Sequence, residues 1–165
     1  MTSKQTLLLE IARTKIGSNA WDINKKRISS DGKVIFLPGE PKCNLFLYEI
    51  LVEAGIPQLL PNIAGRMASE NLDKTGESKE RPFVCRQWFN FEVPNMEFIG
   101  EGEEAMNKTI PGDIVTSGSH IGIISSYRKT ISASTKPESL FLVVENEWGW
   151  REDEIGTMRV FRYRP

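Results

Sequence analysis

The chain has 165 residues, of which 39% are hydrophobic and 26% are charged, and its formal net charge is −1. A chain of this length and composition can bury an adequate core as one domain, residues 1–165, without support from metals or disulfides. The nearly balanced charge gives no electrostatic reason to expect nucleic-acid binding. The aromatic residues are also not interleaved with Lys and Arg as in a single-strand binder, so we expect no nucleic-acid partner.

The first segment predicts an amphipathic helix rather than an export signal. From about Lys4 to Ile16 apolar residues recur at helical spacing, with Thr2 or Ser3 as the N-cap and Gly17 as the stop. Charged residues interrupt the continuous apolar core that a cleavable signal peptide needs, and no run reaches the length of a membrane span. We therefore expect a protein made in the cytoplasm, without a membrane span, that would leave it only by a dedicated secretion route.

A second predicted helix begins at a cysteine. The run KCNLFLYEILVEAG predicts a largely buried helix from Cys43 to about Ala54, with Gly55 as its stop. A thiol at a helix N-terminus is close to unpaired backbone N–H groups and to the positive end of the helix dipole. Both effects favour the thiolate, so Cys43 is the candidate nucleophile.

The middle of the chain, 57–109, has the weakest pattern. It predicts a short helix at Asn62–Leu72 that carries Arg66, a strand or loop at VCRQWFNFEV, and one helical turn at Glu101–Asn107. Arg66 and Trp88 are candidates for lining a groove that binds a carboxylate-bearing peptide. The simpler interpretation of the two is a surface arginine and a half-buried tryptophan.

The last third is rich in strand patterns. Asp113 is expected to shape the turn that leads into the first of these strands. The predicted strands cover residues 113–117, 120–127, 129–134, 140–148 and 157–163. Helices followed by consecutive strands predict an α+β fold, in which N-terminal helices pack on a C-terminal antiparallel sheet.

His120 is the single histidine of the chain and stands at the start of the apolar run HIGIIS. An imidazole on a strand is a common base for a thiol, and the order Cys then His is that of papain-like cysteine hydrolases. One histidine and two separated cysteines do not make a zinc set. We therefore expect catalysis by Cys43 and His120, with no metal and no cofactor.

Three segments carry a more specific resemblance. PGDIVTSGSHIGIIS (Pro111–Ser125) resembles the motif of the NlpC-type and CHAP-type cell-wall amidohydrolases, where a Pro-Gly-Asp turn starts one strand and a His-aliphatic-Gly-aliphatic run starts the next. KCNLFLYEILVEAGIP resembles the nucleophile helix of that superfamily, and IARTKIGSNAW resembles its N-terminal helix and exit loop.

This resemblance implies a papain-like fold and a peptidoglycan amidohydrolase that cuts an amide bond of the cell-wall peptide. Cys43 would attack the carbonyl, His120 would take and return the proton, and the N–H of Cys43 would help to hold the oxyanion. A compact chain without a signal peptide also resembles amidase effectors of type VI secretion, which implies an inhibitory immunity protein as a partner.

A third polar residue usually orients such a histidine, and three candidates are present. Ser132 is the aligned residue in the NlpC-type arrangement, whereas Glu145 in VVENEWGW is aligned in the CHAP-type arrangement, with Asn146 beside it. If 121–125 pairs with 140–144, Glu145 lies opposite His120. We predict Glu145, because a carboxylate stabilises an imidazolium better than a hydroxyl does.

Other interpretations remain open at this point. Cys85 has no comparable context and is expected to be structural or incidental, and a Cys43–Cys85 disulfide, which would remove the nucleophile, is not expected. An acyltransferase or peptidase of the same fold, acting on lipid or intracellular protein, is a second function. A non-catalytic module that binds a muropeptide or a protein is a third.

Overall fold

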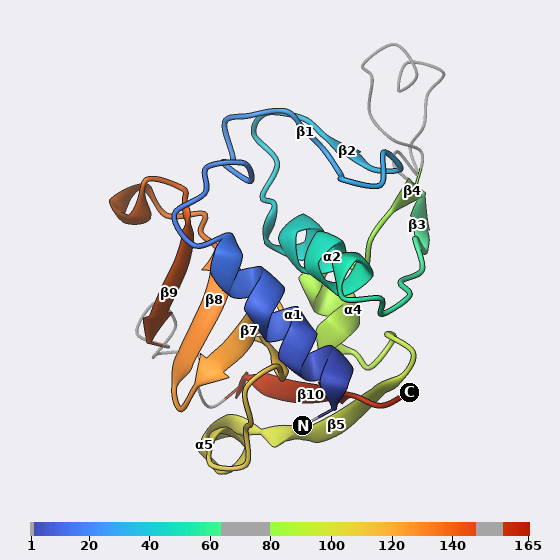
Figure 1. Cartoon of the computed structure of the whole chain (residues 1–165), viewed down its shortest axis with the longest axis vertical. Helices are drawn as coiled ribbons and strands as arrows, with labels where there is room; N and C mark the ends of the chain where they lie inside the picture. Colours follow the sequence, from blue (N-terminus) through green and yellow to red (C-terminus); the bar gives the residue numbers. More distant parts are fainter. Residues whose placement is uncertain (1, 64–79, 148–156) are drawn as a thin grey trace.

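An antiparallel β-sheet with two helices on one face is the frame of the molecule (Figure 1). The structure is a computed structural model, and it describes residues 2–63, 80–147 and 157–165. In this part of the chain the main sheet has six strands in the order β5-β10-β6-β7-β8-β9, each antiparallel to its neighbours. These strands are β5 (Met96–Glu101), β6 (Ile114–Thr116), β7 (Ile121–Ser126), β8 (Lys129–Ala133), β9 (Val143–Glu147) and β10 (Arg159–Tyr163).

The remaining elements lie around this sheet. The helices are α1 (Ser3–Thr14), α2 (Cys43–Glu53), α4 (Cys85–Phe89) and α5 (Gly102–Met106), with a 3₁₀ turn at Pro137–Ser139. Two small ribbons pair β1 (Arg27–Ile28) with β2 (Ile35–Phe36) and β3 (Asn62–Ile63) with β4 (Glu80–Arg81). In Figure 1 the ribbon of β1 and β2 lies beyond α2, away from the sheet.

The main core lies between the helices and the sheet. α1 and α2 contact each other and both contact β7 (Figure 1). Ile121, Ile123 and Ile131 point from the strands into this layer, and Leu47 and Leu51 meet them from α2 as members of the same buried cluster. A smaller apolar cluster lies on the other face of the sheet, beneath α5, and consists of Ala105, Met106, Val115, Ile124, Met158 and Val160.

Most predicted elements are confirmed, with ends that differ by a few residues. Thr2 is the N-cap of α1 and forms a reciprocal capping box with Gln5. The predicted helix at Cys43, the helical turn after Glu101 and the C-terminal strands are all present. The α+β class with an antiparallel sheet is therefore confirmed. The described residues include no helix that is long and apolar enough to cross a membrane.

Two expectations in the middle of the chain and the last third fail, and a third lies mostly outside the described residues. The VCRQWFNFEV segment forms the short helix α4 instead of a strand or loop, and β5 was not predicted. Asn62 and Ile63 are in strand β3, and the rest of the predicted helix Asn62–Leu72, including Arg66, lies outside the described residues. The predicted pairing of 121–125 with 140–144 is wrong, because β8 lies between β7 and β9.

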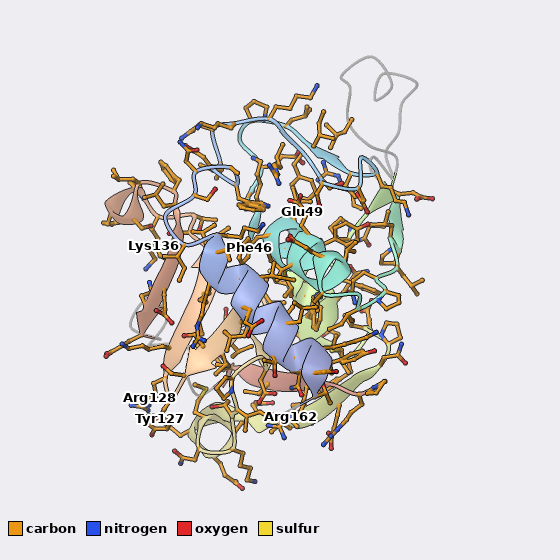
Figure 2. The ribbon with its side chains drawn as sticks, in the orientation of Figure 1. Phe46, Glu49, Tyr127, Arg128, Lys136 and Arg162 are labelled. Carbon is orange, nitrogen blue, oxygen red and sulfur yellow. The ribbon has the colours of Figure 1, made fainter. Side chains whose placement is uncertain are left out.

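Asp113 ties the start of β6 to two distant elements. Its buried carboxylate accepts two hydrogen bonds of 2.8 Å from Arg162 in β10 and one of 2.9 Å from the N–H of Ile110. Gln5 of α1 approaches the same carboxylate at 3.4 Å. The hydrogen bond to Asp113 also raises the pKa of Arg162, whose side chain lies at the sheet in Figure 2. Asp113 thus shapes the turn, as predicted, and also fastens α1 and β10 to it.

A second buried carboxylate, Glu49, holds the segment before α2 against that helix. It extends from α2 toward the β1–β2 ribbon (Figure 2). Trp21 Nε1 donates to it at 2.6 Å, Arg27 forms an ion pair of 2.8 Å, and the N–H of Ser30 donates at 2.7 Å. A buried charge with this many donors is stable only while they stay in place, so Glu49 fixes the ribbon on α2.

We expect Asp113→Asn to lower the free energy of unfolding by about 3 kcal/mol, because it leaves Arg162 without its buried counter-charge. Urea unfolding followed by circular dichroism measures this. The control is Glu104→Gln, which removes an exposed ion pair with Lys108 and should leave stability unchanged within error. Equal stability of the Asp113→Asn variant and the wild type would contradict the structural role of Asp113.

Candidate active site

Cys43 is the first residue of α2, and its side chain is only 3% exposed. No side chain caps this end of the helix, and the residue before it, Lys42, takes the N-cap position. The first-turn N–H groups therefore have no side-chain acceptor and lie beside the sulfur. This is the setting that the sequence predicts for Cys43, and it favours the charged form of a thiol.

Lys42, the residue directly before Cys43, helps to fix the position of the start of α2. Its side chain is buried, and Nζ donates to the carbonyl oxygens of Ile23, Leu37 and Glu40 at 3.3, 3.2 and 3.0 Å. Burial lowers the pKa of the Lys42 ammonium. Three carbonyls from two loop segments thus converge on one cation, which holds those loops around the start of α2.

The turn between β6 and β7 places His120. The Thr116 hydroxyl donates to the carbonyl of His120 at 2.8 Å and accepts from the N–H of Gly118 at 3.0 Å. The N–H of Ser117 also donates to the His120 carbonyl, at 3.1 Å. His120 is 4% exposed and directly precedes β7. Its backbone is thus fixed by these hydrogen bonds, and its ring lies at the N-terminal end of β7.

The structure brings Cys43 and His120 together. His120 and the backbone N–H of Ile121 lie close enough to the Cys43 sulfur to lower the pKa of its thiol. The second ring nitrogen, Nε2, lies 3.0 Å from the hydroxyl oxygen of Ser132. Because Nε2 is engaged there, Nδ1 is the ring nitrogen that remains for the thiol. The result is a chain of three side chains in the order Cys43, His120, Ser132.

Gly122 makes room for this chain. It lies opposite Ser132 in the β7–β8 register. A Cβ at Gly122 would approach the Cβ atoms of Ser132 and Thr130 to 3.3 and 3.4 Å and the Ile131 carbonyl oxygen to 3.2 Å. The first and last of these distances are shorter than most Cβ contacts, so a side chain here would require the neighbouring β8 atoms, including those of Ser132, to shift by a few tenths of an ångström. Glycine at this position of the HIGII run avoids that shift beside the His120–Ser132 pair.

The predicted orienting residue, Glu145, does not lie beside His120. It is exposed and pairs with Ile131 in the β8–β9 register, whereas Ser132 pairs with Val144. Adjacent residues of a strand point to opposite faces, so Glu145 points away from the face on which Ser132 lies. The prediction of Glu145 is therefore wrong, because it assumed that β7 pairs with β9. Ser132 is the residue that contacts the His120 ring. Asn146 shares the face of Ser132 and lines the same cavity as His120, but its side chain is not the partner of the ring.

Cys85 is the residue of the site that the sequence did not indicate. It is the first residue of α4, is 8% exposed, and its sulfur lies 3.6 Å from the sulfur of Cys43. Neither cysteine forms a disulfide. The amide of Asn44 donates to the Phe83 carbonyl at 3.4 Å and so holds the segment before α4 against the start of α2. Only the fold brings residues 43 and 85 together, so no local pattern could have revealed the pair.

The pKa of the Cys43 thiol lies well below its ordinary value. The hydrogen bond with Cys85 is the largest cause. Burial opposes it, because a buried anion is desolvated. The hydrogen bond and charge of His120 and the N–H of Ile121 then lower the pKa further. These contacts thus favour the thiolate form of Cys43.

Two hollows adjoin the pair. Cys43 and Cys85 line a cleft of about 480 Å³ whose charged members are Glu40, Arg81 and Arg86. Arg81 is engaged by an ion pair of 2.7 Å with Glu40, while Arg86 is exposed. His120 and Ser132 instead line a polar cavity of about 430 Å³, together with Ser134, Thr135, Lys136, Glu138, Ser139, Val144 and Asn146. Cys43 thus borders the first hollow and His120 the second.

The groove candidates of the sequence are placed differently. Trp88 is buried and packs edge-on against Phe161, with 6.1 Å between the ring centroids, so it is a core residue. Arg86, two residues earlier, lines the cleft instead. Within residues 2–63, 80–147 and 157–165, no three His, Cys, Asp or Glu side chains are grouped as a metal site.

Comparison of the sequence with protein-family models and with curated proteins finds no match.

We expect Ser132→Ala to slow alkylation of Cys43 by iodoacetamide at neutral pH about fivefold, because one hydrogen bond to the imidazole is lost. Glu145→Gln is the control and should leave the rate unchanged, since Glu145 is exposed and away from the ring. Peptide mass spectrometry after timed alkylation gives the rate at Cys43. A larger effect of Glu145→Gln than of Ser132→Ala would restore Glu145 as the orienting residue.

We expect Cys85→Ala to raise the pKa of Cys43, because its largest stabilising hydrogen bond disappears. The alkylation rate falls as the pH drops through the pKa of the thiol, so in Cys85→Ala this fall occurs at higher pH than in the wild type. Cys85→Ser keeps a donor and should lie between the two. An unchanged profile in Cys85→Ala would show that the second sulfur does not support the thiolate.

Proposed function

We propose that the chain is a papain-like cysteine hydrolase of the NlpC/CHAP type that cleaves an amide bond in the peptide of bacterial peptidoglycan. One observation carries the proposal. The sulfur of Cys43, at the start of α2, lies beside the single histidine of the chain, which lowers the pKa of the thiol, and that histidine is hydrogen-bonded to Ser132. A nucleophile beside a base that a third group orients is the arrangement needed for covalent acyl transfer.

The arrangement of elements also supports the papain-like assignment. The thiol comes from the first turn of a helix that packs on an antiparallel sheet, and the imidazole comes from the start of a strand in that sheet. The polar partner of the imidazole comes from the next strand, β8. This is the place at which the NlpC-type resemblance puts the third residue, so Ser132 favours that type over the CHAP type.

In the proposed reaction the Cys43 thiolate attacks the carbonyl carbon of the scissile amide, and a C–S bond forms. The amide nitrogen leaves with a proton from His120, which produces a thioester on Cys43. His120 then takes a proton from water, the resulting hydroxide attacks the thioester, and the thiolate is released. Ser132 is a positioning residue throughout, since it holds Nε2 and keeps Nδ1 directed at the sulfur.

Backbone N–H groups beside the sulfur stabilise the negative charge of the tetrahedral intermediate. The N–H of Cys43 belongs to the first turn of α2, where no side chain caps the helix. Donors of this kind are fixed before the reaction begins and therefore need no rearrangement as charge develops. The network of Lys42 around the same turn keeps them fixed.

The substrate class rests on the sequence resemblance and is supported by the charges of the cleft. Peptidoglycan stems are short peptides that carry free carboxylates. Arg86 is exposed in the wall of the cleft that Cys43 lines, and a guanidinium pairs well with a carboxylate. Arg86 is thus the side chain that we assign to bind the peptide next to the scissile bond.

Digestion of purified peptidoglycan, with mass spectrometry of the released fragments, tests the function. We expect the wild type to release peptide fragments, and Cys43→Ala and His120→Ala to lose this activity by about a hundredfold or more, because each removes a reacting group. Glu145→Gln is the matched control and should retain activity. Circular dichroism of each variant confirms that the fold persists.

Three outcomes would contradict the proposal. Unchanged release in Cys43→Ala or His120→Ala would remove these residues from the chemistry. A reactive Cys43 without any release from peptidoglycan would favour a papain-like enzyme that acts on lipid or protein. A Cys43 that is neither reactive nor needed for release would favour a binding module.

A further inference from the structure

We propose that Cys43 and Cys85 form an oxidation site, at which a peroxide converts the two thiols into a disulfide that a dithiol reductant reopens. The observation behind it is the 3.6 Å separation of the two sulfurs. These are the two cysteines of the entire sequence, and neither is in a disulfide in the structure. Cysteines that are distant in the sequence thus form a pair in the site assigned to the nucleophile.

The pair is accessible to a small oxidant, although neither side chain is exposed on the surface. Cys43 is 3% and Cys85 8% exposed, and both line the cleft of about 480 Å³. Hydrogen peroxide is small enough to enter such a cleft. Because the second sulfur already lies 3.6 Å from the first, closure within one chain is favoured over exchange between two chains.

The first step is oxidation of Cys43. Its thiolate attacks one oxygen of the peroxide, the O–O bond breaks, and Cys43 becomes a sulfenic acid while the other oxygen leaves as hydroxide. Sulfur loses two electrons and the peroxide gains them. The contacts that favour the thiolate, from His120 and the N–H of Ile121, make Cys43 rather than Cys85 the sulfur that reacts first.

The second step is closure by Cys85. Its sulfur attacks the sulfenic sulfur, the S–O bond breaks, and the hydroxide that leaves takes the Cys85 proton to form water. A disulfide needs a sulfur separation of about 2.05 Å, so the sulfurs must approach by roughly a further 1.5 Å from their 3.6 Å separation. Cys85 begins a helix of five residues, so rotation of its side chain and a small shift of this short helix can supply the approach.

Closure has two consequences. It removes the nucleophilic sulfur of Cys43, so oxidation stops the proposed hydrolysis until the disulfide is reduced. This loss of activity rests on the proposed function, whereas formation of the disulfide does not. It also protects Cys43, because a neighbouring thiol captures the sulfenic acid before a second peroxide converts it irreversibly to the sulfinic acid. A reductant then returns both thiols.

The test needs no substrate. Reduced full-length protein is treated with hydrogen peroxide, quenched in acid, alkylated with N-ethylmaleimide under denaturing conditions and analysed by intact and peptide mass spectrometry. We expect both cysteines to lose alkylation together, the protein to lose the mass of two hydrogens, a cross-linked peptide to join Cys43 to Cys85, and dithiothreitol to restore both thiols. Sulfinic acid on Cys43 with Cys85 still alkylated, or a disulfide-linked dimer, would overturn the proposal.

Cys85→Ser is the matched variant, since it keeps the size and polarity of the second residue but has no second sulfur. With excess peroxide we expect its Cys43 to reach the sulfinic acid, which dithiothreitol does not reduce. Full recovery in this variant would show that Cys85 does not protect Cys43. Because the readout is the state of the thiols, a failed peptidoglycan digestion with an intact disulfide response would contradict the proposed function alone.

Discussion

The site depends on one contact, the docking of the start of α2 against the first residues of β7. This contact places the Cys43 sulfur against the His120 ring and the N–H of Ile121. The same packing buries the apolar face of α2 on the sheet, so the hydrophobic effect that stabilises the fold also holds the thiol and the imidazole together. The chemistry that we propose therefore follows from how a helix covers a sheet.

Buried polar groups make that contact rigid. The Lys42 ammonium gathers three carbonyls around the start of the helix, and the Thr116 hydroxyl fixes the turn that carries His120. Asp113 and Glu49 fasten the more distant segments in the same way. Each of these groups is costly to bury and is stable only with its partners in place, so the folded chain holds Cys43 and His120 in fixed positions.

Features that depend on neighbouring residues in the sequence could be predicted from it. The capping residues and apolar spacing of α1 and α2, the Asp113 turn and the C-terminal strands could all be identified in the sequence, and so could the positions of Cys43 and His120. Long-range pairing could not. Glu145 was preferred because β7 was expected to pair with β9, and insertion of β8 between them makes Ser132 the partner of the imidazole. Cys85 was likewise considered structural, because its closeness to Cys43 exists only in the folded chain.

The central claim is that Cys43 reacts as a preformed thiolate, and the pH dependence of kcat/KM for a soluble peptidoglycan peptide tests it most directly. This quantity reports the ionisation of the free enzyme. With the pKa of Cys43 lowered by its contacts with Cys85 and His120, we predict that activity persists as the pH falls well below about 8.5, the ordinary value for cysteine. Activity that rises only as the pH passes about 8.5 would show an ordinary thiol and contradict the account.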